Sequence, residues 1–199
     1  MMILVYGGSG SGKSAFAEKR ITELKENRVS LYYLATMRVY GDEDRERVRS
    51  HRMLRKDKGF ITIEQPRNIC NVAERLDDEK GDVLLECMSN LVANEMFQTE
   101  EAVEGLGEEH ADNANDGHYM DDKSIFYKGV VTKIKNDIVA LKKSCDNLVV
   151  VSNNVFEDGV IYEPDTMKYI KALGDINRYL AKLSDEVWEV VAGIPIRIK

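Results

Sequence analysis

The sequence has few cysteines, prolines and histidines, three of each in 199 residues, and it has no long apolar run. The cysteines, Cys70, Cys87 and Cys145, are odd in number and lie far apart without C-x-x-C spacing. This pattern predicts reduced thiols that serve in packing and not a disulfide framework. No apolar run approaches the roughly 20 residues that a membrane helix needs, and the first residues run into glycines without the basic segment of a signal peptide. The sequence therefore predicts a cytoplasmic protein with no membrane span.

An excess of positive charge is also missing, because the formal net charge is −7. The stretch from Glu100 to Asp122 holds nine carboxylates and no Lys or Arg, so the rest of the chain carries −7 + 9 = +2. A nucleic-acid-binding protein would show a strongly basic face, so that class is excluded. The acidic stretch is rich in Gly, Asn and Asp and poor in apolar residues, which predicts a mobile loop. The length predicts one domain over residues 1–199, with an acidic insertion at about 100–122.

Strands and helices are predicted to alternate along the chain. Apolar and β-branched runs predict strands at 2–6, 29–35, 60–64, 82–87, 148–152, 187–192 and 194–198. Helical spacing or high charge predicts a helix that begins at 14, helices at 42–58 and 71–76, a helix that starts at 91–97, and helices at 125–143 and 167–183. This alternation favours an α/β fold of the P-loop NTPase kind, with a mostly parallel sheet flanked by helices and a strand pair at the C-terminus.

The strongest motif lies between the first strand and the first helix. It fits G-x-x-x-x-G-K-[ST] and consists of Gly7, Gly8, Ser9, Gly10, Ser11, Gly12, Lys13 and Ser14. The glycines let successive backbone N–H groups point at phosphate oxygens, and the N-terminus of the helix adds to the positive field. Lys13 is predicted to reach the β- and γ-phosphates, and the Ser14 hydroxyl to ligate Mg²⁺. A flexible Gly/Ser turn is the alternative, and the flanking strand and helix argue against it.

A second metal-holding acid is predicted at Glu86, which ends the apolar run Val83-Leu84-Leu85. At that place it would hold Mg²⁺ directly or through water, together with Ser14. The alternative is an ordinary carboxylate at the end of a strand.

His51 lies among arginines. On a helix, Arg47 and Arg55 would lie one turn before and after it on the same face, which would grip a polyphosphate. Nearby cations disfavour the imidazolium form, so His51 would stay neutral and able to attack phosphorus. The alternative is a surface histidine on a basic helix. The other histidines, His110 and His118, lie in the acidic stretch, where a solvated loop is favoured over a metal site.

Taken together, these residues resemble the bifunctional adenosylcobinamide kinase/adenosylcobinamide-phosphate guanylyltransferase family of cobalamin biosynthesis, as a divergent member. The similar pieces, in order, are Met2-Ile3-Leu4-Val5 with the phosphate loop, Tyr33-Leu34-Ala35-Thr36, Asp42-Glu43 with Arg47-Val48 and His51, Glu64 and Pro66, Val83-Leu84-Leu85-Glu86-Cys87, Asn94, Asn153, Gly174, Asn177, Asp185-Glu186-Val187-Trp188 and Val190-Val191-Ala192-Gly193-Ile194. Only the phosphate loop is specific by itself. The order and spacing of the pieces over nearly the whole chain carry the resemblance.

The resemblance implies two successive reactions, with ATP and GTP as substrates and Mg²⁺ as cofactor. A nucleoside triphosphate first donates its γ-phosphate to the aminopropanol hydroxyl of adenosylcobinamide. GTP then transfers GMP to His51, and the phosphorylated cobinamide accepts GMP to give adenosylcobinamide-GDP. The resemblance also implies a sheet closer to recombinase-type domains than to small-metabolite kinases, and a homo-oligomer, a trimer in this family.

Two segments depart from the family pattern. After the strand at 148–152, the family's Thr-Asn-Glu-Val-Gly is replaced by Ser152-Asn153-Asn154-Val155-Phe156, so an acid is lost at Asn154. Further on, an arginine and an aspartate are missing from Met167-Lys168-Tyr169-Ile170-Lys171, and Arg178 replaces a usual Gln. These losses leave two alternatives open. One is a P-loop small-molecule kinase without guanylyl transfer, and the other is a nucleotide-binding descendant without catalysis.

Overall fold

A computed structural model describes residues 1–24, 30–38, 58–76, 80–97, 119–156 and 159–199, together with Gly41, Glu46, Arg49 and Met53. From 119 to 125 it describes the backbone only. Most of the helix predicted at 42–58, including His51, Arg47 and Arg55, lies outside the described residues, as does the acidic stretch up to residue 118. The prediction of a mobile insertion there therefore stays a prediction.

The chain alternates between strands and helices, as the sequence predicts. The strands are β1 (Met2–Gly7), β2 (Ser30–Ala35), β3 (Phe60–Glu64), β4 (Gly81–Glu86), β5 (Leu148–Asn153), β6 (Glu186–Val191) and β7 (Ile194–Arg197). The helices are α1 (Lys13–Leu24), the 3₁₀ helix η1 (Ile69–Arg75), α3 (Met88–Met96), α5 (Tyr119–Ser144) and α6 (Pro164–Leu183). No helix of the described residues is both long and apolar enough to cross a lipid bilayer.

The seven strands form one sheet in the order β3-β2-β4-β5-β1-β6-β7. Every neighbouring pair is parallel except β6 and β7, which form an antiparallel pair at the C-terminus. Residues Met2–Val5 of β1 and Leu148–Val151 of β5 are buried on both faces of the sheet, which explains why these stretches are continuous apolar runs instead of alternating ones. The predicted α/β fold with its C-terminal strand pair is confirmed.

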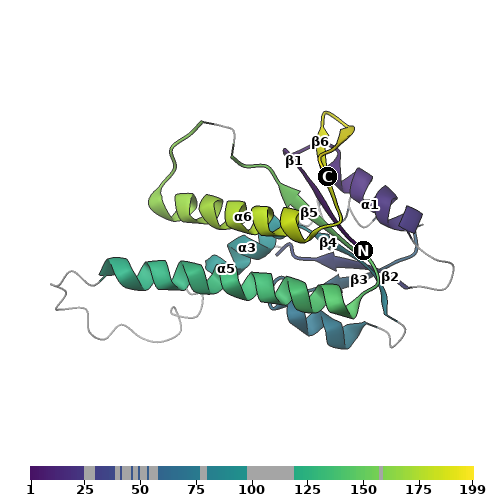
Figure 1. Ribbon diagram of the computed structural model, residues 1–199, viewed down its shortest axis with the longest axis horizontal. Helices are drawn as coiled ribbons and strands as arrows, with labels where there is room; N and C mark the ends of the chain where they lie inside the picture. Colours follow the sequence, from purple (N-terminus) through teal and green to yellow (C-terminus); the bar gives the residue numbers. More distant parts are fainter. Residues whose placement is uncertain are drawn as a thin grey trace.

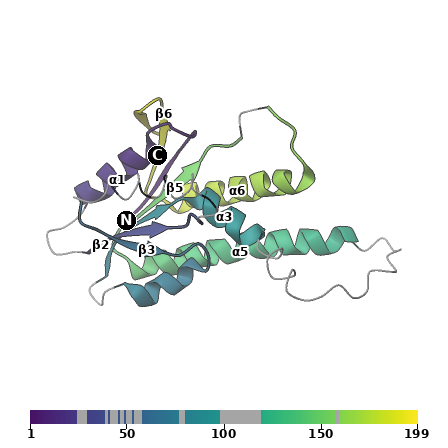
Figure 2. The same ribbon diagram turned by 180° about the vertical axis from the view of Figure 1, so that it is seen from behind.

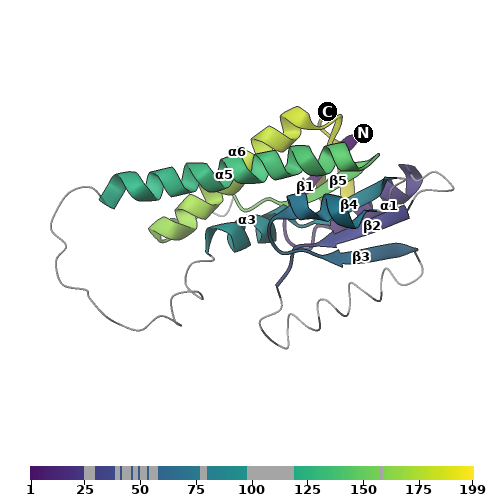
Figure 3. The ribbon, with the colours of Figure 1, turned by 90° about the horizontal axis from the view of Figure 1, so that it is seen from below.

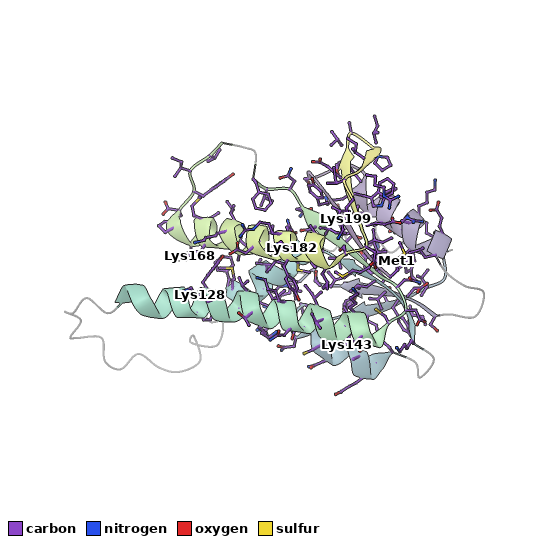
Figure 4. The ribbon with its side chains drawn as sticks, in the orientation of Figure 1. Met1, Lys128, Lys143, Lys168, Lys182 and Lys199 are labelled. Atoms are coloured by element: carbon purple, nitrogen blue, oxygen red, sulfur yellow. The ribbon has the colours of Figure 1, made fainter. Side chains whose placement is uncertain are left out.

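The helices cover the two faces of the sheet unequally (Figure 1). Helix α1 lies on one face, and α3, α5 and α6 lie on the other, as the view from behind also shows (Figure 2). Seen from below, β3 forms the open edge of the sheet (Figure 3). Helices α5 and α6 run side by side in the same direction, with Lys128 and Lys168 toward one end and Lys143 and Lys182 toward the other (Figure 4).

Two apolar clusters fill the spaces between these layers. The larger one lies under α3, α5 and α6, and the buried side chains of α5 include Val130, Ile134, Ile138 and Leu141, the positions that helical spacing indicates. The smaller one packs Ala17 and Ile21 of α1 against β1, β4 and β5. Helix α1 is also tied to β6, because the Arg20 guanidinium donates to both carboxylate oxygens of Glu186, at 2.9 Å to Oε1 and 3.3 Å to Oε2.

Three local expectations need correction. The chain is already helical at 119–122, which the sequence assigns to the acidic loop. The helix predicted at 71–76 is a 3₁₀ helix that begins at Ile69, after Asn68 in the left-handed conformation with φ 50°. Cys87 follows β4 instead of ending it, because Cys87 caps α3.

The edge strand β3 offers a matched test of the core. Ile63 is 3% exposed, whereas Ile61, two residues earlier, is 49% exposed. Ile63→Ala is expected to lower the free energy of unfolding by about 2–5 kcal/mol, because it leaves a cavity against the larger cluster. Ile61→Ala should cost about 1 kcal/mol or less. Urea unfolding of both variants checks this, and equal costs would contradict the described packing.

Candidate nucleotide site

The phosphate loop, residues 7–12, joins the carboxyl end of β1 to the N-terminus of α1. Gly10 and Gly12 have positive φ values of 70° and 90°, which residues with a Cβ rarely adopt. A Cβ at Gly7 would lie 2.5 Å from the Val190 carbonyl oxygen of β6, so this position has no room for a side chain. The loop is closed on itself by the Ser11 N–H, which donates to the Gly8 carbonyl at 3.2 Å. Its shape is that of a cradle for phosphate oxygens.

The turn between β6 and β7 braces the loop from outside. The Gly193 N–H donates to the Ser11 carbonyl at 2.8 Å, and the Gly193 Cα lies 3.3 Å from where a Cβ of Gly12 would be. From the other side, the Asn154 N–H donates to the Gly7 carbonyl at 2.9 Å. The C-terminal strand pair and the exit of β5 therefore hold the loop in its curled form.

Lys13 is 8% exposed and folds back over the loop, where its Nζ donates to the Gly8 carbonyl at 3.0 Å. Burial lowers the pKa of Lys13 below its ordinary value, and the negative charge of Glu86 opposes that shift. An anion in the loop would replace part of the lost hydration and favour the charged ammonium. The side chain is thus placed to bind phosphate.

Ser14 and Glu86 are in contact at the carboxyl edge of the sheet. The Ser14 hydroxyl donates to Oε1 of Glu86, although α1 follows β1 and Glu86 ends β4, two strands away. A hydroxyl oxygen beside a carboxylate is a set of hard oxygen donors, which suits a small cation such as Mg²⁺. The other carboxylate oxygen, Oε2, accepts a hydrogen bond of 2.8 Å from the Tyr33 hydroxyl. Both oxygens of the carboxylate are therefore oriented before any ligand binds.

The register of the sheet explains why Tyr33 reaches Glu86. Ala35 of β2 lies opposite Glu86 of β4, so Tyr33 is its diagonal neighbour on the face that α1 covers. The ring of Tyr33 is 5% exposed and lies edge-on to Phe60, at 6.1 Å between centroids. Sequence reasoning did not assign Tyr33 to the site, because the contact depends on the pairing of β2 with β4.

The exits of β2 and β4 are also locked together. The Thr36 hydroxyl donates to the Cys87 carbonyl at 2.7 Å and accepts from the Cys87 N–H at 2.8 Å. The Asn94 amide donates to the Thr36 carbonyl at 2.8 Å and to the Pro66 carbonyl at 3.1 Å. Burial raises the pKa of the Cys87 thiol, so this cysteine stays protonated beside the site. These contacts fix the backbone on both sides of Glu86.

The structure thus brings together the phosphate loop, Lys13, Ser14 and Glu86. The predicted histidine site of His51, Arg47 and Arg55 lies outside the described residues. Of the departures from the family pattern, Asn154 accepts the Phe156 N–H through Oδ1 at 3.3 Å, Lys168 bonds Asp165 at 2.6 Å, and Lys171 lies over the Tyr127 ring at 5.6 Å.

Comparison with known proteins places the chain in a family. It is 29% identical over 200 residues to the bifunctional adenosylcobalamin biosynthesis protein CobU of Escherichia coli (strain K12), and 31% identical over 205 residues to the protein of the same name in Salmonella typhimurium (strain LT2). Each alignment covers 100% of both chains. Among solved structures, the flagellar accessory protein FlaH from Methanocaldococcus jannaschii is similar with a TM-score of 0.42 and 12% identity, over 100% of this chain and 77% of that one. Residues 3–198 match the family described as cobinamide kinase / cobinamide phosphate guanyltransferase, and the chain belongs to that family.

Proposed function

We propose that this chain phosphorylates adenosylcobinamide with a nucleoside triphosphate and then transfers GMP from GTP, through a guanylylated His51, to give adenosylcobinamide-GDP. The observation that carries the proposal is the phosphate loop with Lys13 folded over it and with Ser14 against Glu86, in a chain that matches this family over residues 3–198. The corrinoid and the two nucleotides, ATP and GTP, are the substrates.

In the first reaction, the loop N–H groups and Lys13 hold the β- and γ-phosphates. Lys13 would exchange its bond to the Gly8 carbonyl for bonds to phosphate oxygens. Phosphoryl transfer passes through a loose transition state with charge on the γ-phosphate oxygens, so positioning and a fixed positive charge provide most of the catalysis. A buried ammonium stabilises that charge more than a solvated one does.

Ser14 and Glu86 are the residues that would hold Mg²⁺, with Tyr33 fixing the orientation of the Glu86 carboxylate. The bound ion would neutralise charge on the β- and γ-phosphates. The hydroxyl of Ser14 and the carboxylate of Glu86 already point at each other, so little rearrangement is needed to present two oxygens to a cation.

In the second reaction, a ring nitrogen of His51 would attack the α-phosphorus of GTP. A phosphorus–nitrogen bond forms, the bond from the α-phosphorus to the bridging oxygen breaks, and pyrophosphate leaves with the electron pair. An oxygen of the cobinamide phosphate then attacks the same phosphorus, and the phosphorus–nitrogen bond breaks to release the imidazole. Arg47 and Arg55 would hold the phosphates during both steps.

A kinase without guanylyl transfer is the second candidate, because the chain lacks the family's acid at Asn154 and an arginine and an aspartate in the segment 167–171. Lysines nearby could replace these charges only in part. Lys168 pairs with Asp165, and Lys171 lies over Tyr127, so both are engaged on α6 and its neighbour α5. A lysine also lacks the bidentate geometry of an arginine toward phosphate.

Labelling with α-³²P-GTP and Mg²⁺ tests the proposed function. The wild-type chain is expected to keep an acid-labile label after denaturation, and His51→Ala to lose it, because only an imidazole at that position forms the phosphoramidate. His118→Ala is the matched control and should keep the label. Phosphorylation of adenosylcobinamide from γ-³²P-ATP should survive in His51→Ala.

Two results of that experiment would contradict the proposal. If the wild-type chain takes up no label but still phosphorylates adenosylcobinamide, the chain is a kinase without guanylyl transfer. A label that persists in His51→Ala would mean that another residue carries the GMP.

The contact of Tyr33 with Glu86 predicts a specific metal dependence. Tyr33→Phe keeps the ring against Phe60 and removes only the hydroxyl that holds Oε2 of Glu86. The Mg²⁺ concentration for half-maximal phosphorylation is expected to rise by about 10-fold. Tyr32→Phe, one residue earlier and packed in the cluster on the other face, is the control and should leave it unchanged. Equal Mg²⁺ dependence in both variants would show that Tyr33 does not position the metal-holding acid.

The proposal includes a homo-oligomer, a trimer by the family resemblance, built from one P-loop α/β domain with an acidic insertion at about 100–122. Exposed isoleucines on β7 support a subunit contact, since Ile194 is 65% and Ile196 45% exposed. Light scattering of the purified chain is expected to give three times the monomer mass of 22.6 kDa. A monomer mass over the whole concentration range would contradict the assembly.

A further inference from the structure

A buried glutamate on α1 is paired with a lysine from another part of the chain. The Glu18 side chain is only 5% exposed, and its Oε2 accepts a hydrogen bond of 2.5 Å from the Nζ of Lys58, whose side chain is 43% exposed. Among the described residues, Lys58 is the one cation in an ion pair with Glu18. A buried carboxylate without a partner is costly, so this contact holds Lys58 firmly against α1.

Lys58 lies at the end of the connection that carries His51. The parallel neighbours β2 and β3 are joined by residues 36–59, and Lys58 stands two residues before the start of β3. His51 precedes Lys58 by seven residues. Seven residues of chain span at most about 25 Å, so the contact with Glu18 limits how far His51 can lie from α1.

Two contacts tie this end of the connection to the groups that would hold the metal. Glu18 follows Ser14 by four residues, which places it one turn further along the same face of α1. Two residues after Lys58, the Phe60 ring packs edge-on against Tyr33, whose hydroxyl holds the carboxylate that ends β4. The end of the connection is therefore fixed on one side through α1 and on the other through β2.

We infer that the Glu18–Lys58 ion pair positions the connection that carries His51 for guanylyl transfer. The inference rests on the proposed function, in which a ring nitrogen of His51 attacks the α-phosphorus of GTP. The pair takes no part in the bond changes. Its effect is on the distance between the attacking nitrogen and the phosphorus, and an error of about 1 Å in such a distance can cost on the order of 100-fold in rate.

The same geometry predicts that phosphoryl transfer does not need the pair. Within the part of the chain that the structure describes, neither Glu18 nor Lys58 bonds to the phosphate loop through its side chain. The β- and γ-phosphates are held by the loop and by Lys13, which stay in place without it. Loss of the pair should therefore slow one of the two reactions and spare the other.

Removing the charge of Lys58 tests the inference. In Lys58→Met, the rate constant of labelling at saturating α-³²P-GTP is expected to fall by about 10-fold or more, while the GTP concentration for half-maximal rate stays unchanged. Lys58→Arg keeps the charge and should label nearly as fast as the wild type. Lys19→Met is the matched control, because Lys19 is 74% exposed and pairs with Glu23 of the same helix, so it should label at the wild-type rate.

A double-mutant cycle separates the lost interaction from a simple loss of stability. Lys58→Met leaves the Glu18 carboxylate buried without its partner, whereas the double variant Glu18→Gln/Lys58→Met removes that charge as well. The double variant should label as slowly as Lys58→Met and no slower, because the two changes remove one shared interaction. Both variants should phosphorylate adenosylcobinamide from γ-³²P-ATP at the wild-type rate, which also shows that they fold.

The outcomes separate this inference from the proposed function. A wild-type rate of labelling in Lys58→Met would overturn the inference and leave guanylyl transfer standing. An equal loss in labelling and in phosphorylation would also overturn it, because the pair would then support the fold alone. A wild-type chain that takes up no label would refute guanylyl transfer itself, and the inference would fail with it.

Discussion

The contact between the Ser14 hydroxyl and the Glu86 carboxylate is the constraint on which the site depends. Ser14 belongs to the first turn of α1, and Glu86 ends β4, with β5 lying between β4 and β1. The two groups can meet only if all three strands run parallel and end at the same edge of the sheet. Tyr33 then fixes the remaining carboxylate oxygen from the next strand, β2. The orientation of the Glu86 carboxylate therefore depends on the order of four strands, β2, β4, β5 and β1.

A second constraint is the lack of room for side chains at two glycines of the phosphate loop. Gly7 lies too close to the Val190 carbonyl for any side chain, and the turn at Gly193 presses against Gly12. The C-terminal strand pair therefore does more than extend the sheet. It holds the loop in a curled form and, through the end of β6, also forms one wall of a hollow of about 920 Å³ beside it. Residues that follow the first strand and residues of the last two strands thus build one site.

The two faces of the sheet carry different apolar clusters. The face covered by α1 carries Tyr33, whose hydroxyl bonds Glu86 and whose ring meets Phe60, and Trp188, whose ring packs against Phe16 of α1. The face covered by α3, α5 and α6 holds the larger apolar cluster, and the first turns of α6 extend beyond it to line the hollow.

The sequence by itself determined the phosphate loop, the strand–helix alternation and the buried stripe of α5 at Val130, Ile134, Ile138 and Leu141. Each of these depends on residues a few positions apart, where backbone geometry and periodicity act directly. It also pointed to Glu86 and to the family, while the roles of His51, Arg47 and Arg55 stay predictions. Only the tertiary structure decided that Glu86 meets Ser14, that Tyr33 holds Glu86, and that Lys58 pairs with Glu18. Those contacts arise from strand order and register, which are set by packing between residues far apart in the chain and leave no local pattern.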